Sequence, residues 1–125
     1  MTARRKADAT KVHAAIRKFA LDLPGAWEDT PWEEDHVAKV GKKIFVFMGS
    51  PASATPGIAV KLPDSKEQAL SLGCATPSGY GLGKAGWVNV QLTAPDRPSV
   101  DVLCDWVEES YRAIAPKKLI AELDG

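Results

Sequence analysis

Between Trp87 and Leu92 the chain alternates between two kinds of side chain with the two-residue period of a β-strand. The alternation separates a buried set from a presented set: Val88, Val90 and Leu92 against Trp87, Asn89 and Gln91. A Gly-rich stretch with one lysine, residues 76–86, leads into this strand. We therefore expect a surface that presents an indole ring and two amides, with the rest of the chain organised around it.

The remaining elements follow from hydrophobic periodicity and from the residues that stop it. Helices are predicted at four places: from Lys11 to about Leu21, from Asp64 or Ser65 to about Leu72, from Ser99 to Ile114, and after Pro116. Strands are predicted at Val37–Val40, Lys43–Met48 and Ile58–Leu62, besides the strand at Trp87. The two-residue turn Gly41-Lys42 joins the first two strands into a hairpin. This order predicts an α+β, two-layer domain, with a mainly antiparallel sheet and helices packed on one face.

Length and charge limit the organisation of the chain and its partners. Its 125 residues suit a single domain, residues 1–125, in which residues 1–9 form a flexible basic tail. Lys+Arg 16 equals Asp+Glu 16, so a polyanion would have to bind a local basic patch. Cys74 and Cys104 lack the spacing of a zinc site or a disulfide framework. No apolar run is long enough for a signal peptide or a membrane span, so we expect a cytoplasmic protein.

Carboxylates and one histidine gather between Ala26 and His36, beside Trp27 and Trp32. The carboxylates are Glu28, Asp29, Glu33, Glu34 and Asp35. Because Pro31 interrupts the run, we expect a solvated acidic loop. A cation site is the alternative, since clustered carboxylates are typical ligands of hard cations. The tryptophans beside the carboxylates could also hold a basic peptide.

No complete catalytic constellation is visible in the sequence. The motif Gly-x-Gly-x-Gly-Lys at residues 79–84 differs from a phosphate loop, because Ala85 follows the lysine and a strand follows the loop. Glycines of a tight turn are the first interpretation, and backbone amides that hold an anion together with Lys84 are the second. His13 and His36 are not identifiably paired with a Ser or Cys nucleophile. We expect neither enzymatic activity nor a cofactor.

Lysines in or beside the predicted strands carry the functional hypothesis. They are Lys39, Lys42, Lys43, Lys61 and Lys84. Lys39 and Lys61 should point out of the sheet, opposite core residues. If they share a face with Trp87 and Asn89, the sheet presents a basic surface with an aromatic platform, which suits phosphate backbones and stacked bases. Solubilising lysines on exposed strands are the alternative interpretation.

Three groups of short motifs run through the chain in order. The first is Leu23-Pro24-Gly25-Ala26, Glu28, Pro31-Trp32 and Lys39-Val40-Gly41-Lys42-Lys43-Ile44-Phe45. The second is Pro77, Gly79-Tyr80, Leu82, Lys84 and Trp87, and the third is Ser110-Tyr111-Arg112 with Pro116-Lys117-Lys118-Leu119. Together they resemble the MmcQ/YjbR family from about Val12 to Leu123. The resemblance implies a CyaY-like, or secretion-chaperone-like, α+β fold and a DNA-binding role, without established catalytic residues. The relation to CyaY is one of fold, so it implies no iron binding.

We therefore predict a non-enzymatic binding domain of the MmcQ/YjbR type, with DNA as the first candidate ligand. Trp87 would stack on bases, and Asn89 and Gln91 would form hydrogen bonds. Phosphate contacts would come from Lys39, Lys42, Lys61 and Lys84. The alternative is a protein-interaction or small-molecule module, in which Trp87 lines a groove under the Gly-rich loop.

Overall fold

The structure, a computed structural model, describes residues 2–32, 35–49, 56–79 and 82–125, with the side chains of all of these except residues 2–7, 32 and 83. The strands are β1 (Ala26–Trp32), β2 (Asp35–Val40), β3 (Lys43–Gly49), β4 (Gly57–Lys61), β5 (Ala75–Pro77) and β6 (Trp87–Gln91). The helices are α1 (Thr2–Leu21), α2 (Lys66–Leu70), α3 (Val100–Ile114) and α4 (Lys117–Asp124), with a 3₁₀ turn, η1, at Leu82–Ala85.

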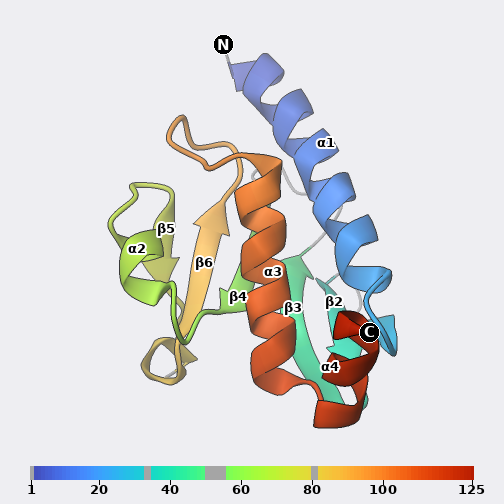
Figure 1. Ribbon diagram of the computed structural model, residues 1–125. Helices are drawn as coiled ribbons and strands as arrows, with labels where there is room; N and C mark the ends of the chain where they lie inside the picture. Colours follow the sequence, from blue (N-terminus) through green and yellow to red (C-terminus); the bar gives the residue numbers. More distant parts are fainter. Residues whose placement is uncertain (1, 33–34, 50–55, 80–81) are drawn as a thin grey trace.

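The strands form one sheet in the order β1-β2-β3-β4-β6-β5, and every neighbouring pair is antiparallel. Figure 1 shows α1, α3 and α4 on one side of this sheet, with α3 crossing its middle strands. Within the described ranges, no helix covers the opposite side, which we call the outer face. The predicted α+β, two-layer architecture is therefore confirmed.

The core lies between α3 and the sheet. Ser99 caps α3 by accepting a hydrogen bond from the Val102 amide at 3.4 Å, so the predicted helix start is confirmed. Leu103, Val107 and Tyr111 recur at helical spacing and are fully buried. The helix therefore forms because its apolar stripe matches the inner face of the sheet.

Two polar side chains tie α3 to distant segments. The Tyr111 ring packs edge-on against Phe45 with centroids 5.3 Å apart, and its hydroxyl donates to the Pro24 carbonyl at 2.5 Å. The fully buried Ser110 hydroxyl accepts from the Lys61 amide at 2.9 Å and donates to the Phe45 carbonyl at 2.5 Å. Ser110 thus links β3 and β4 close to where their direct pairing ends.

The predicted hairpin at Gly41-Lys42 is confirmed. Val40 pairs with Lys43 across the turn, and Gly41 has a φ of +63°, in the left-handed region that favours glycine. β3 lies between β2 and β4, so its central position is also confirmed. The predicted strands at residues 58–62 and 87–92 correspond to β4 and β6 within one residue.

The predicted start of the first helix is wrong. The helix α1 begins at Thr2 instead of Lys11, and Thr10 lies inside it instead of capping it. Ala9 is fully buried in the core, so the apolar stripe extends further towards the N-terminus than the prediction allowed. Residues 2–9 contain neither Gly nor Pro, and packing of Ala9 stabilises the added turns. Neither this helix nor any other in the described ranges is long and apolar enough to cross a membrane.

The predicted acidic loop is also wrong, because most of it is strand. Residues 26–32 form β1, the edge strand that pairs with β2. The three-residue β5, next to the Gly-rich stretch, was missed as well. The predictions for Glu33 and Glu34, for loop residues 50–55 and for residues 80–81 fall outside the described residues.

Candidate functional site

The presented set of β6 lies on the outer face, as predicted. In the pairing of β4 with β6, Lys61 lies opposite Trp87 and Ala59 lies opposite Asn89. The alternate β6 residues Val88 and Val90 belong to the buried core on the helix side. Lys61 therefore shares the outer face with the presented residues of β6.

The Trp87 side chain, however, is buried against its neighbours. Only 8% of its surface is exposed, and its ring meets Phe47 edge-on with centroids 5.2 Å apart. Phe47 in turn pairs with the fully buried Val37 on β2. The indole ring is therefore unavailable to a base, and the stacking role predicted for Trp87 does not fit its burial.

The two amides of β6 are accessible and lie beside a hollow. Asn89 is exposed and accepts a hydrogen bond from the Ser78 hydroxyl at 2.8 Å, and Gln91 donates to Thr93 at 3.1 Å. A depression of about 470 Å³ is lined by both amides and by Phe47. Small residues on β4 (Gly57 and Ala59) line it as well. The hollow combines an apolar floor with polar walls.

Lys39 differs from the other predicted phosphate contacts. Its ammonium forms an ion pair with Asp29 at 2.7 Å, and its side chain is only 18% exposed. The same ammonium lies 5.3 Å from the centre of the Trp27 ring. The charge of Lys39 is thus neutralised within the sheet, so the structure does not offer it to a ligand.

The other lysines gather at one end of the fold, which we call the basic end. It consists of Lys42, Lys43, Lys61, Lys84, Lys117 and Lys118. These side chains come from the β2–β3 turn, the end of β4, η1 and the start of α4. None of them forms an ion pair with another residue of the described ranges, and all except the half-buried Lys61 are exposed.

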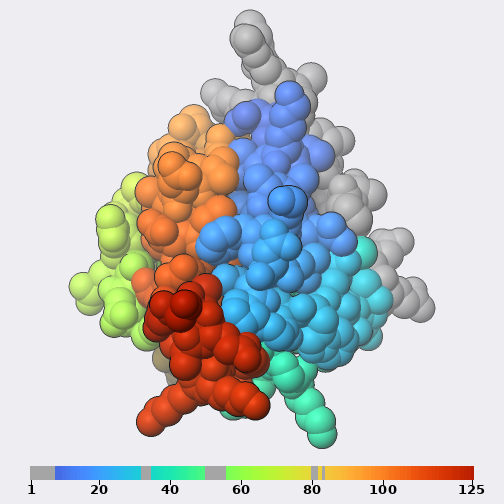
Figure 2. Space-filling view, turned by 45° about the vertical axis from the view of Figure 1, so that its right-hand side comes forward, coloured from blue at the N-terminus to red at the C-terminus, as the bar shows by residue number. Residues whose placement is uncertain are grey.

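Strand pairing and local contacts bring these four segments to the same end, since antiparallel β3 and β4 place the end of β4 at the same sheet edge as the β2–β3 turn. The Leu62 amide donates to the Gly86 carbonyl, which places η1 beside the end of β4. Leu119 of α4 packs closely over Gly25, next to the residues where β1 meets the β2–β3 turn. Figure 2 shows the teal β2–β3 turn and the red start of α4 together at the lower end of the molecule. Sequence reasoning named Lys117 and Lys118 only as part of a family motif and therefore missed their place in this surface.

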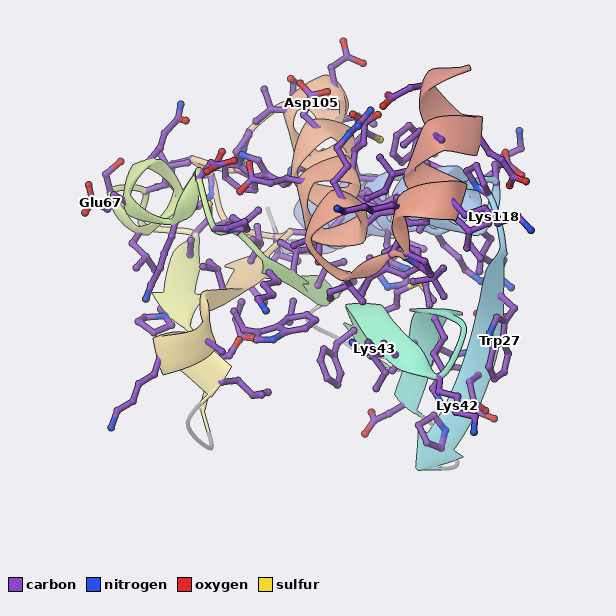
Figure 3. All side chains as sticks on the ribbon, turned by 60° about the horizontal axis from the view of Figure 1, so that its bottom comes forward. Trp27, Lys42, Lys43, Glu67, Asp105 and Lys118 are labelled. Atoms are coloured by element: carbon purple, nitrogen blue, oxygen red, sulfur yellow. The ribbon has the colours of Figure 1, made fainter. Side chains whose placement is uncertain are left out.

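Several exposed acidic side chains lie away from the basic end, although the exposed Asp64 follows the end of β4. Figure 3 views the molecule from that end and shows Lys42, Lys43 and Lys118 on the same half as Trp27, with Glu67 on the far side. Glu67 on α2 is exposed, as are two aspartates of α3, Asp101 and Asp105. The zero net charge therefore conceals a polarised surface.

Trp27 is an exposed aromatic residue that the sequence analysis assigned to the acidic loop instead of the sheet face. It pairs with Lys39 across β1 and β2, so both lie on the outer face. Its exposed fraction is 43%, the highest of any large apolar side chain in the described ranges. The alternation of Trp27 and Asp29 with Glu28 and Thr30 was the available signal, since only a strand separates them into two faces.

The acidic residues of β1 are already paired. Arg17 of α1 donates two hydrogen bonds to Glu28, at 2.7 and 2.6 Å, and His36 lies 3.2 Å from the same carboxylate. The Arg17 guanidinium, and secondarily His36, hold the pKa of Glu28 below its usual range, and Lys39 does the same for Asp29. In the part of the chain that the structure describes, no three His, Cys, Asp or Glu side chains converge as metal ligands would.

The buried histidine and the two cysteine thiols are poorly suited to nucleophilic chemistry. His13 is buried on α1, with its Nε2 2.6 Å from the Met48 carbonyl oxygen. Burial raises the pKa of both free thiols, Cys74 and Cys104, with nearby carboxylates adding to the effect. A raised thiol pKa lowers the thiolate population that nucleophilic chemistry needs.

Comparison with known proteins shows the family to which the chain belongs. No curated protein matches the chain. A sequence model of the YjbR family matches residues 21–113, from the end of α1 through most of α3. The matched range holds β1 to β6 and the outer face, whereas Lys117 and Lys118 follow it. The match confirms the resemblance read from the motifs, and the chain belongs to the YjbR family.

Proposed function

We propose that this chain is a non-enzymatic binding domain that holds nucleic acid through its basic end and the adjoining outer face. The main support is that lysines without an ion pair in the described ranges, from four separate segments, lie at the same end of a chain with zero net charge. Lysine ammonium groups position phosphate backbones, so this end would attract a polyanion that the rest of the surface does not.

The residues of this surface have distinct roles in the proposal. The lysines of the basic end contact phosphates, and Asn89 and Gln91 offer donors and acceptors to bases further along β6. Trp87 packs against Phe47 on the outer face and does not stack on a base. Lys39 is excluded from phosphate contact because Asp29 already neutralises it.

Binding without chemistry is consistent with the titratable groups. His13 is occupied by a backbone carbonyl and His36 by Glu28, so neither is paired with a nucleophile among the described residues. The raised pKa values of the thiols of Cys74 and Cys104 make them poor nucleophiles at neutral pH. Free thiols also persist in a reducing compartment, and we propose the cytoplasm as the location.

Fluorescence anisotropy with labelled single-stranded and double-stranded oligonucleotides, each at two salt concentrations, tests the function. We expect affinities of roughly micromolar or weaker at low salt, falling steeply as salt rises because each neutralised phosphate releases counterions. The variants Lys42→Ala and Lys84→Ala should each weaken binding and reduce the salt dependence. Lys11→Ala, which removes an exposed lysine from α1, is the matched control and should change neither.

Two results would reject nucleic-acid binding. One is the absence of a signal with every oligonucleotide at low salt. The other is binding that both lysine variants leave untouched, since the basic end would then not be the contact surface.

A second candidate function, a small-molecule or peptide site, rests on the hollow beside β6. Its volume of about 470 Å³ is large enough for a small ligand, and Phe47 with the two amides offers mixed apolar and polar contacts. Such binding would be nearly indifferent to salt, unlike phosphate binding. Replacing Ala59, on the floor of the hollow, by Leu should block this ligand and leave oligonucleotide affinity unchanged.

A further inference from the structure

Trp27 is exposed and yet fixed in orientation. It keeps 43% of its surface exposed, while its indole Nε1–H donates to the Gly41 carbonyl at 3.0 Å. That carbonyl belongs to the β2–β3 turn, which also carries Lys42. A rigid, exposed indole ring is a large contact surface that loses little conformational entropy on binding.

A partly buried ion pair supports the ring from the sheet. Lys39 lies 5.3 Å from the ring centre, a cation–π distance, and Asp29 holds the Lys39 ammonium at 2.7 Å. Because the Lys39 side chain is only 18% exposed, it positions the ring and leaves phosphate contact to its neighbours. Two contacts therefore fix Trp27 without covering it.

Exposed lysines lie on the same half of the molecule as this ring. Lys42 and Lys43 occupy the turn that accepts the indole hydrogen bond, and Lys118 lies on the same half of the molecule (Figure 3). Phosphates that follow a base placed on Trp27 would thus meet unpaired ammonium groups. An aromatic platform within a basic groove is the arrangement by which proteins hold single strands.

We propose that Trp27 is a base-stacking residue and that the basic end consequently prefers single-stranded nucleic acid to duplex. This inference rests on the proposed function and specifies the form of its ligand. Bases inside a duplex already stack on their neighbours, so an exposed indole ring gains a partner only from an unpaired base. The packed Trp87 cannot take this role, because its exposed fraction is 8%.

The test measures anisotropy with a labelled oligodeoxythymidine and with a blunt-ended duplex of equal length. Trp27→Leu should weaken single-strand binding by about fivefold to a hundredfold, the usual effect of losing one stacked base. Trp27→Phe, which keeps a ring, should retain most of the affinity. Val102→Ala is the matched control, since it shortens another exposed apolar side chain, on α3, and should change nothing.

A second measurement identifies the ring that touches the base. The single strand should quench tryptophan fluorescence of the unmodified protein, and Trp27→Phe should abolish most of that quenching while binding persists. Thermal melting of each variant shows that it is folded, so a loss of affinity in Trp27→Leu reports the ring and not unfolding.

The possible results separate this inference from the proposed function. Single-strand affinity unchanged in Trp27→Leu, or a duplex bound more tightly than the single strand, overturns the stacking role. If the lysine variants still weaken binding when either result is found, nucleic-acid binding stands without the stacking role of Trp27. If no oligonucleotide binds at all, both are wrong.

Discussion

Replacing Ser110 by alanine removes a hydroxyl that completes the hydrogen bonding between two strands. The hydroxyl accepts a hydrogen bond from the Lys61 amide at 2.9 Å and donates one to the Phe45 carbonyl at 2.5 Å. Ser110 is fully buried, so no solvent replaces it. The alanine variant leaves a donor on β4 and an acceptor on β3 without their partner.

The expected cost follows from those two groups. A buried polar group that loses its partner costs about 1–3 kcal/mol, and the Phe45 carbonyl should incur this in full. The Lys61 amide is only partly buried and can recover some hydration, so we expect a total loss of about 2–3 kcal/mol. That loss is a substantial fraction of the roughly 5–15 kcal/mol by which such domains are stable.

Urea denaturation followed by tryptophan fluorescence measures this loss as a shift of the midpoint at an unchanged slope. Ser71→Ala is the matched control, because its exposed hydroxyl donates to the Gln68 carbonyl at 2.6 Å and its removal should cost less than about 0.5 kcal/mol. A comparably small effect in Ser110→Ala would refute the reasoning. It would show that β3 and β4 can close the gap and pair directly.

Three further perturbations follow from the described contacts. Val107→Asp places an unpaired charge in the core and should destabilise the protein by several kcal/mol, on the order of 3–5, in a thermal melt; an unchanged melting temperature would contradict the packing of α3. Glu28→Gln should lower stability by roughly 1 kcal/mol or less at neutral pH. Because Arg17 depresses the folded-state pKa of Glu28, this difference should shrink as the pH falls below the ordinary value of 4.5, and a pH-independent difference would contradict the pairing. Titration with calcium, iron(II) or zinc should give no saturable calorimetric heat below about millimolar, since Glu28 and Asp29 are already paired; a saturable signal would reinstate the cation site.

Elements with a strong local pattern could be predicted from the sequence. The helix α3 combines a serine cap with an apolar stripe, so its start was predicted correctly. The hairpin at Gly41 was correct because the turn needs a left-handed residue between two alternating strands. In these elements the local preference and the tertiary packing require the same structure.

The errors occur where tertiary partners override the local pattern. Polar residues and Pro31 make β1 resemble a loop, yet Arg17 neutralises Glu28 and Lys39 neutralises Asp29, which allows the segment to pair with β2. These partners come from another helix and another strand, so no local window includes them. The N-terminal turns of α1 depend in the same way on the burial of Ala9.

The candidate site could be predicted only in part, for a related reason. Strand alternation placed Asn89, Gln91 and Lys61 correctly on the outer face. It could not show that Phe47 from β3 packs against Trp87, or that Trp27 is the exposed ring instead. Alternation gives the direction of a side chain, whereas exposure depends on what the neighbouring strand places beside it.

The equal numbers of basic and acidic residues hide the basic end, because ion pairs within the fold remove many of these charges from the surface. The arginines whose side chains are described, Arg17, Arg97 and Arg112, all form ion pairs within the fold. Each such pair removes one positive and one negative charge from the surface together. The charges left over include the lysines of the basic end and acidic residues exposed on α2 and α3. A chain that is neutral in sum can therefore present a strong local field, because association depends on the unpaired charges at the contact surface and not on their total.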